Sequence, residues 1–223
     1  MKDTGFIERH GLTSVINVSG TMTSLGASRT VPEAIRAGAE IQPHFVRIDE
    51  LQAKASEIIA RMTRAEAGFV AACSAAGISH SIAGCITGSN LNRIELLPDT
   101  ARLPHEVVIQ AGHLINYGAP ISQAISLTGA QIVSVGSAAL VNFYNLEDCI
   151  GEQTAAALYI VSHHVVQEGQ IALEEFITIC KKLGVPVIVD MASEYDLRSP
   201  IELGADVVIY SSHKFLGGPT GGI

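Results

Sequence analysis

The sequence predicts an α/β fold with three layers, in which helices cover both faces of a mostly parallel central sheet. Short apolar segments rich in valine and isoleucine alternate along the chain with longer segments of helical periodicity. Hydrophobic residues make up 48% of the 223 residues and charged residues 16%, so the chain has enough apolar side chains for a large core. Because strands and helices alternate, we expect right-handed crossover connections between parallel strands.

Six short, mostly apolar segments are expected to be the strands of this sheet: 67–72, 106–110, 131–135, 156–161, 185–189 and 207–210. A strongly amphipathic helix over residues 48–63 precedes the first of them, and its apolar positions Leu51, Ile58 and Met62 share one face. Further helices are expected over residues 78–87, 121–128, 146–152 and 172–183. Gly184 stands where the last of these helices should have its C-terminal glycine.

The chain is expected to divide into an N-terminal region, residues 1–66, and a main α/β domain, residues 67–223. Within the N-terminal region, residues 15–20 form a short strand or an extended arm, and a loop of small and polar residues follows. A helix then begins at Pro32, with Thr30 as its candidate cap.

Composition and charge argue against several classes of function. The formal net charge is −8 and no lysine or arginine cluster is present, so a nucleic-acid partner is not expected. No apolar run has the length of a membrane span, and residues 1–5 lack the pattern of a signal peptide. The four cysteines stand at neither CxxC nor zinc-ligand spacing, so we expect no metal and interpret them as reduced thiols of a cytoplasmic protein.

A turn of small residues, Ser74-Ala75-Ala76-Gly77, connects the first predicted strand to a helix. Small side chains let a ligand approach the backbone, and the free N–H groups at a helix start favour an anion. Ser74 adds a hydroxyl donor. The turn has neither the GxxxxGK[ST] nor the GxGxxG pattern, which disfavours a sugar-nucleotide enzyme. Tight packing of the helix on the sheet is the alternative explanation of these small residues.

A carboxylate and a lysine follow two later strands at the same predicted edge of the sheet. Asp190 ends an apolar strand, where a carboxylate needs a partner: a backbone N–H, Arg198, or a protonated ring nitrogen of a cofactor. Lys214 follows the strand 207–210 in the stretch Ser211-Ser212-His213-Lys214, and a glycine-rich turn comes next. It is either a surface lysine or one that forms a Schiff base. An anion cradle, a partner for a ring nitrogen and an imine-forming amine are together what pyridoxal phosphate requires.

These motifs resemble those of fold-type I pyridoxal-phosphate enzymes, and in particular the selenocysteine synthase-like group that includes D-glucosaminate-6-phosphate ammonia-lyase. The resemblance rests on residues 16–26, on Ser74–Gly77, on Val189-Asp190-Met191-Ala192 and on residues 211–219, and it covers essentially the whole chain. The segment 211–219 is the most specific of the four, because Ser-x-His-Lys followed by glycines recurs around the cofactor lysine of that family.

The resemblance implies a role for each residue of the predicted site. Lys214 would form the Schiff base and move the α-proton, and Asp190 would bind the pyridine nitrogen. The phosphate would be held by Ser74, Ala75, Ala76 and Gly77, with help from Ser211 or His213. His113 is expected to stack on the ring, because it ends the strand that follows the phosphate-binding helix. His163 and His164 are either further ring neighbours or polar loop residues.

The resemblance further implies a pyridoxal 5′-phosphate-dependent lyase or transferase that acts on a small-molecule substrate, an amino acid or amino-sugar acid, by α-proton removal and β-elimination. Transfer of selenium to a seryl-tRNA is less expected, because the chain is acidic. The alternatives are an aminotransferase, and a non-catalytic protein or one half of a split enzyme that acts with a partner chain. The C-terminal small domain of the family is expected to be missing, since the sequence ends at Ile223. A homodimer or higher homo-oligomer is expected, with residues 17–29 as the arm exchanged between subunits.

Overall fold

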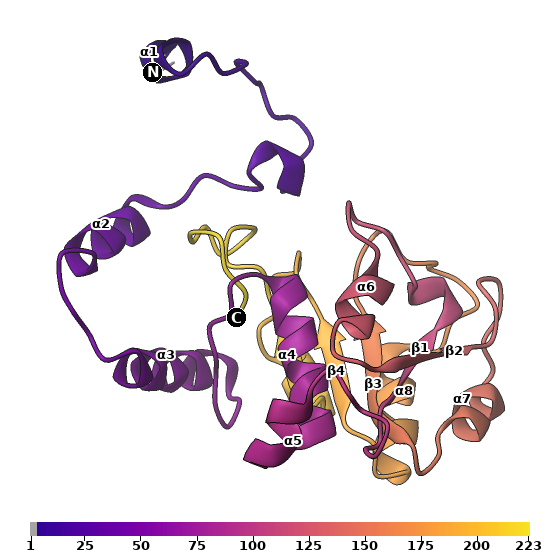
Figure 1. Ribbon diagram of the computed structural model, residues 1–223. Coiled ribbons are helices and arrows are strands. Elements are labelled where there is room, and N and C mark those ends of the chain that lie inside the picture. Colours follow the sequence, from indigo (N-terminus) through magenta and orange to yellow (C-terminus); the bar gives the residue numbers. More distant parts are fainter. Residues whose placement is uncertain (1–3) are drawn as a thin grey trace.

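Five parallel strands form the central sheet in the order β2-β1-β3-β4-β5 (Figure 1). They are β1 (Glu106–Gln110), β2 (Gln131–Val135), β3 (Thr154–Ile160), β4 (Val187–Asp190) and β5 (Val207–Ile209). The computed structural model describes residues 4–223, so residues 1–3 of the predicted N-terminal region lie outside the described part. Every strand except the predicted 67–72 is confirmed to within two residues at either end.

The register of the sheet brings the carboxyl ends of its last three strands to one level. Ile160 at the end of β3 pairs with Asp190 at the end of β4, and Asp190 pairs with Ile209 at the end of β5. Side chains that follow these strands therefore meet at a common edge, which is where open α/β sheets bind their ligands.

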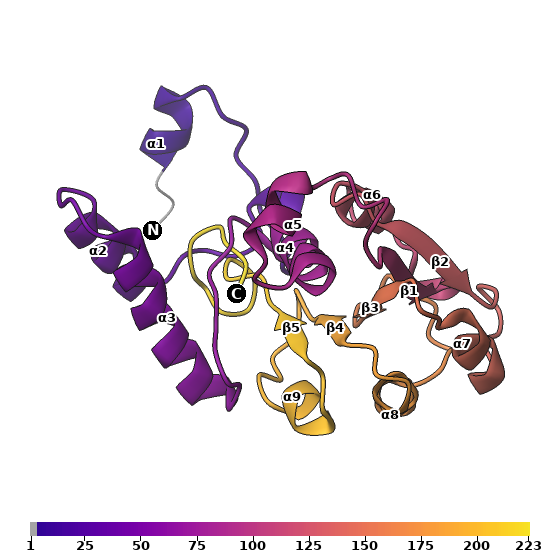
Figure 2. The same cartoon turned by 60° about the horizontal axis from the view of Figure 1, so that its bottom comes forward.

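Helices cover both faces of the sheet, as predicted (Figure 2). On one face lie α4 (Ser74–Thr87), α5 (Leu91–Leu96) and α6 (Ile121–Ser126). On the other lie α7 (Phe143–Cys149), α8 (Leu173–Lys182) and α9 (Ser199–Leu203). The chain reverses after α8 at Gly184, whose φ of 74° is the left-handed conformation that glycine adopts readily.

Two apolar cores lie on the two faces of the sheet, and alternate strand residues belong to each. In β1, Val107 and Ile109 face the core under α4 and α6, whereas Val108 faces the core that contains Phe176 of α8. Because the three inner strands β1, β3 and β4 are buried on both faces, their central residues are continuously apolar rather than alternating.

The prediction of a sheet strand over residues 67–72 is wrong. This segment is extended, but Ala71 makes a single antiparallel bridge, to Gly222, and residues 67–72 pair with no strand of the sheet. The side chain of Gln52 on α3 (Ile48–Thr63) bonds both the N–H and the C=O of Val70, at 3.1 and 2.8 Å. The backbone groups of Val70 and Ala71 are therefore satisfied by the side chain of Gln52 and by the backbone of Gly222.

Several helix starts differ from the predictions. The residues Ser74–Gly77, expected as a turn, form the first turn of α4, and Cys73 is the N-cap. Thr30 does not cap α2 (Pro32–Ile41): Val31 is the N-cap residue, and the Thr30 hydroxyl donates to the carbonyl of Gly218 at 3.3 Å. Pro32 suits the first helical position, because an N–H there would have no partner within the helix. The short helices α1 (Thr4–Arg9) and α5 were not predicted.

The N-terminal helices and the arm between them stand apart from the sheet (Figure 1). Residues 15–20 form an extended arm rather than a strand, and a short 3₁₀ turn, η1 (Thr23–Leu25), follows. Neither apolar core contains any of the described residues 4–77. The division of the chain between residues 66 and 67 stays a prediction. None of the helices described in residues 4–223 has the length and apolar character needed to cross a membrane.

Candidate active site

The N-terminus of α4 forms a ready cradle for an anion at the carboxyl edge of the sheet. Cys73 precedes the helix in an extended conformation, and its Sγ accepts a hydrogen bond from the N–H of Ala76 at 3.4 Å. Within the described residues, the N–H groups of Ser74 and Ala75 have no acceptor, as is usual for the first turn of a helix. These amides and the helix dipole favour a negative group in front of them.

Two serine hydroxyls meet at this cradle. Ser211, which is 2% exposed, donates from its Oγ to the Oγ of Ser74 at 2.9 Å. Gly77 lets α4 lie close to β5, because a Cβ at this position would be 3.1 Å from Cγ2 of Ile209. The structure thus brings Ser211 to the predicted phosphate-binding residues Ser74, Ala75, Ala76 and Gly77. Ser74 and Ser211 are 137 residues apart in the sequence.

Asp190 lies at the end of β4 and is only 7% exposed. Its Oδ1 accepts a hydrogen bond from the backbone N–H of Ala192 at 3.1 Å, which is one of the partners expected for it. Arg198, the other protein partner considered, instead donates from Nε to the carbonyl of Met62 at 3.0 Å. Burial raises the pKa of Asp190 to about 6, while the Ala192 N–H and the charge of Lys214 act in the opposite direction.

Lys214 lies in the loop that follows β5, and its side chain is half-buried. The amine donates from Nζ to Oγ of Ser193 at 2.7 Å. Burial lowers the pKa of Lys214, and the nearby negative charge of Asp190 opposes this effect. Lowering of this kind increases the fraction of neutral amine, which is the form that attacks a carbonyl group.

The N-terminal arm holds the backbone of the lysine loop in place. The carbonyl of His213 accepts from the N–H and the Oγ of Ser28, at 3.0 and 2.7 Å. The N–H of Val31 donates to the carbonyl of Gly217 at 2.8 Å, and Gly217 has a φ of 63°, a value that suits glycine. Residues 17–29 were expected as an arm exchanged with a second subunit, whereas Ser28 here bonds the lysine loop of its own chain. The sequence shows no local pattern that indicates this contact.

His213 and Tyr117 complete the surroundings of these groups. Nδ1 of His213 is buried and has no hydrogen-bond partner within the described residues, so it can bind an added group. Burial raises the pKa of Tyr117, and the charges of Asp190 and Cys73 contribute, which places the phenol near both. Tyr117 lies in an irregular loop before α6, so no pattern in the sequence indicated it.

The ring of His113 lies beside the carboxyl end of β3 but is buried rather than open to a ligand. Its ring is 1% exposed, its Nδ1 accepts from the N–H of Ile160 at 3.1 Å, and it lies edge-on to Tyr159 with 4.5 Å between ring centroids. Burial lowers its pKa to about 4, so the ring is neutral. The position after β1 suggested a ring-stacking residue, but the short 3₁₀ turn η2 (Ala111–His113) directs this side chain into the protein.

His163 and His164 are exposed in the loop after β3, with their ring centroids 3.9 Å apart. The backbone N–H of His164 donates to Oγ of Ser162 at 3.2 Å. The structure therefore agrees with polar loop residues, and within residues 4–223 neither histidine bonds to Asp190 or Lys214.

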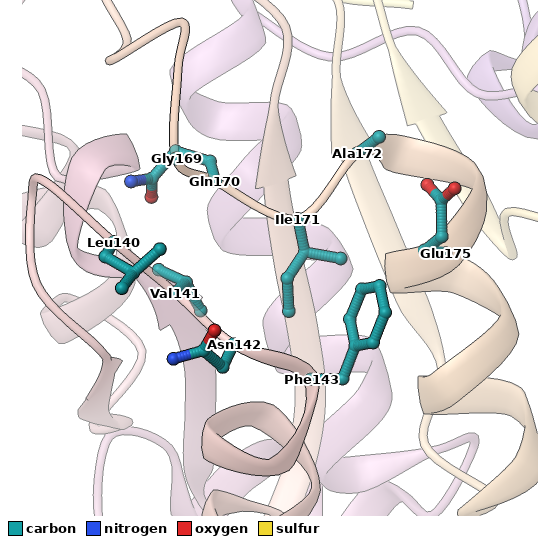
Figure 3. A pocket seen from close by; sticks show the side chains of 9 residues that line it. All are labelled: Leu140, Val141, Asn142, Phe143, Gly169, Gln170, Ile171, Ala172 and Glu175. Carbon is teal, nitrogen blue, oxygen red and sulfur yellow. The ribbon is translucent and has the colours of Figure 1, made fainter.

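A cavity of about 380 Å³ lies away from this site, between the loop after β2 and the start of α8 (Figure 3). Leu140, Val141 and Asn142 line one side, and Ile171 and Glu175 line the other. None of the predicted site residues lines this cavity. We therefore locate the candidate site by the polar groups that meet at the edge of the sheet, and not by this cavity.

The residues present fit pyridoxal phosphate on the geometry alone. The free amides of α4 and the Ser74–Ser211 pair suit a phosphate, and the buried carboxylate of Asp190 suits a protonated ring nitrogen. Within the described residues, Oδ2 of Asp190 accepts no hydrogen bond and Nδ1 of His213 has no hydrogen-bond partner, so both atoms are available to the cofactor. Lys214 supplies an amine of lowered pKa at the same edge.

Comparison with known proteins identifies relatives over nearly the whole chain. D-glucosaminate-6-phosphate ammonia lyase of Salmonella typhimurium is 43% identical over 212 residues, which is 95% of this chain and 58% of that protein. A Streptomyces 5′-C-glycyluridine monooxygenase-decarboxylase is 36% identical, over 95% of this chain and 54% of that one. The L-seryl-tRNA(Sec) selenium transferase of Nitratidesulfovibrio vulgaris is 26% identical, over 94% and 47%. The chain thus spans about half the length of these relatives.

Solved structures show the same fold. The structure of a D-glucosaminate-6-phosphate ammonia-lyase superposes with a TM-score of 0.95 at 42% identity, over 97% of this chain and 59% of that one. The pyridoxal-5′-phosphate-dependent protein YhfS of Escherichia coli has a TM-score of 0.56 at 18% identity, over 77% and 42%, which shows the shared fold alone. The resemblance stated from the motifs is confirmed. The profile of the family described as L-seryl-tRNA selenium transferase (SelA) matches residues 15–223, and the chain belongs to this family.

Proposed function

We propose that this chain binds pyridoxal 5′-phosphate and contributes the cofactor lysine of a lyase or transferase that acts on an amino acid or amino-sugar acid. The observation that carries the proposal is the meeting of the α4 N-terminus, Asp190 and Lys214 at one edge of the sheet. When bound, the cofactor supplies an electron sink for the charge left on the α-carbon after its proton is removed.

Each group of this chain has a distinct part in that chemistry. The amides of Ser74 and Ala75, with the hydroxyls of Ser74 and Ser211, hold the phosphate and fix the orientation of the ring. The carboxylate of Asp190 pairs with the protonated ring nitrogen, and its burial strengthens this pairing. Nζ of Lys214, as a neutral amine, takes the proton from the α-carbon of the substrate.

Elimination of a β-group is the reaction we favour, because a relative that is 43% identical is named as an ammonia lyase. The selenium transferase described above shares 26% identity with this chain, which makes transfer to a seryl-tRNA the second choice. We place the protein in the cytoplasm, where its four free cysteines would remain reduced.

The cofactor claim is tested by adding pyridoxal phosphate to the purified protein and recording the visible absorbance band of a lysine-bound pyridoxal group. Borohydride reduction followed by peptide mass spectrometry should locate the cofactor on Lys214. Lys214→Ala should lose the band, whereas Lys54→Ala, which changes an exposed lysine on α3, should keep it. A band that survives in Lys214→Ala would refute the assignment.

Turnover distinguishes the reactions. Ammonia release from an amino-sugar acid supports the lyase, and transfer of the amino group to a 2-oxo acid supports an aminotransferase. A band without turnover of any amino acid would favour the second candidate, a protein that acts through assembly with a partner chain. The observation that favours this candidate is the apolar face of α3, where Leu51, Ile58 and Met62 remain 43–52% exposed. A homodimer would cover such a surface.

A further inference from the structure

The position of Ser193 beside Lys214 gives this serine a part in the proposed site that no motif indicated. Ser193 lies three residues after Asp190, and its Oγ is 2.7 Å from Nζ of Lys214. Both side chains are half-buried. Within residues 4–223 this is the one hydrogen bond of the lysine amine, and Lys214 forms no ion pair there.

The loop that carries Ser193 is fixed at several points, so the hydroxyl has a defined place. The N–H of Ala192 donates to Asp190, and the carbonyl of Ala192 accepts from the N–H of Ser211 at 3.3 Å. Farther along, the hydroxyl of Tyr210 donates to the carbonyl of Asp196 at 2.6 Å. These bonds tie the loop after β4 to the segment after β5, from which Lys214 comes.

Asp190 is the competing partner of the lysine. The opposite charges of Asp190 and Lys214 act on one another, as the direction of both pKa effects shows. An ion pair between them would occupy the carboxylate needed by a ring nitrogen and the amine needed by an aldehyde. Instead, the amine is bonded to the hydroxyl of Ser193.

We infer that Ser193 is a positioning residue that holds the amine of Lys214 away from Asp190, so that both groups stay available to the cofactor. The inference rests on the proposed function. A hydroxyl suits this task, because it accepts a hydrogen bond from an ammonium group and donates one to the lone pair of a neutral amine. Ser193 can therefore hold the lysine in both protonation states.

Other ionisable groups around this point are few and belong to several elements. Asp190 ends β4, Tyr117 lies in the loop before α6, and Cys73 precedes α4. His213 precedes Lys214 in the same loop, and Glu194 follows Ser193. Of these groups, Asp190 is the one whose charge raises the pKa of Lys214. Loss of the Ser193 contact should therefore let the amine move toward this carboxylate.

The first test uses the cofactor-free protein. Lys214 is labelled with acetic anhydride at a series of pH values, and peptide mass spectrometry measures the extent of labelling. In Ser193→Ala we expect the titration of Lys214 to move to higher pH by about one pH unit, because the amine pairs with Asp190. Ser193→Thr, which keeps a hydroxyl, should restore the profile. Ser162→Ala is the control, since Ser162 follows β3 at the same edge and bonds the N–H of His164.

The second test measures how fast the visible band appears after pyridoxal phosphate is added. We expect Ser193→Ala to form it about tenfold more slowly at neutral pH, a difference of ~1.4 kcal/mol in activation free energy. Coincident labelling profiles for the wild-type protein and Ser193→Ala would overturn the inference, as would equal rates. If no protein forms the band, the proposed function fails, while the labelling profiles still decide whether Ser193 controls Lys214. Circular dichroism establishes that each variant is folded.

Discussion

The carboxyl group of Asp190 is kept at a cost to the stability of the cofactor-free protein. It is buried at the end of β4 with one backbone N–H donor, and its pKa is raised from 3.8 to about 6. A folded-state pKa above the unfolded value means that the protonated form is favoured in the folded protein. The stability that it contributes is therefore present below pH 3.8 and is lost as the pH rises through about 6. A residue with this profile is retained for a purpose other than stability.

Asp190→Asn should have two effects: it should stabilise the cofactor-free protein, and it should weaken cofactor binding. The amide keeps an oxygen for the N–H of Ala192 and removes the buried charge, so the free energy of unfolding should rise by about 1–3 kcal/mol at pH 8 and by little at pH 4. Affinity for pyridoxal phosphate should fall at least tenfold, or ~1.4 kcal/mol. Denaturant melts across pH and a titration of the absorbance band measure both effects.

Asp148→Asn on the exposed surface of α7 is the control for this prediction and should change neither quantity. Equal stability of the wild-type protein and Asp190→Asn at pH 8 would contradict the assignment of a buried, destabilising carboxylate.

The parts of the site that could be predicted from the sequence are those that directly follow a strand. Asp190 and Lys214 come at the ends of apolar runs, and parallel topology brings such positions to one edge. Ser193 and Tyr117 lie within loops, and their contacts depend on how the loops fold back across the edge. His113 follows a strand as well, but a 3₁₀ turn decides which way its ring points, and the spacing of apolar residues carries no information about this.

At the scale of elements, the start of α4 depends on the strand-like segment at residues 221–223. The N–H of Gly222 donates to the carbonyl of Ala71 at 2.9 Å, and the N–H of Ile223 donates to the carbonyl of Tyr210 at the same distance. This segment lies between the extended residues before α4 and the end of β5, and it is antiparallel to the segments it bridges. The backbone of Cys73 and Ser74 is packed directly against Gly222.

Gly222→Ala should disturb the anion cradle. An added Cβ would lie 2.5 Å from the carbonyl oxygen of Cys73 and 2.9 Å from the N of Ser74, and neither backbone atom can move without shifting the helix start. We expect a loss of about 1–3 kcal/mol in the free energy of unfolding and weaker binding of pyridoxal phosphate. Gly84→Ala in the same helix meets open space and should instead stabilise the protein by about 0.5–1 kcal/mol. Thermal melts and cofactor titrations of both variants measure the contrast, and similar behaviour of the two would refute it.

Elements with a strong local period were predictable, and those defined by distant partners were not. The predicted helix over 48–63 matches the structure because its apolar residues recur at helical spacing, and the strands over 106–110 and 131–135 match because each is a short run of apolar, β-branched residues. The segment 67–72 has the composition of a strand, yet a strand also needs a neighbour. Its neighbour is the 221–223 segment, about 150 residues later in the chain, and no feature within 67–72 indicates this.

At the scale of the molecule, the N-terminal arm and the lysine loop form one unit. Ser28→Ala removes the hydroxyl that donates to the carbonyl of His213 at 2.7 Å. We expect the loop to be less stable by about 1 kcal/mol. Hydrogen exchange of the amides of residues 214–218 should be faster by roughly fivefold, in line with this free energy. Ser19→Ala, elsewhere in the arm and exposed, is the control. Unchanged exchange in Ser28→Ala would contradict the coupling.

Self-association through α3 can be tested with a single charge. Ile58, which is 49% exposed, lies on the apolar face of this helix, and a glutamate there would face an apolar contact. If this face is the subunit interface, Ile58→Glu should weaken the dimer at least tenfold in analytical ultracentrifugation. Ala53→Glu adds the same charge on the opposite side of α3 and should leave the association unchanged. Equal dissociation constants for the two variants would exclude α3 as the contact.

The bonds between the arm and the lysine loop also set an order of events during synthesis. Ser28 and His213 are 185 residues apart, and Thr30 and Gly218 are 188 apart, so the arm leaves the ribosome well before its partners in the lysine loop. Loop closure over such a distance is slow compared with the formation of the local strand–helix units. The arm therefore stays without these partners until the five strands have been synthesised, and the segment that carries Lys214 becomes ordered only after β5.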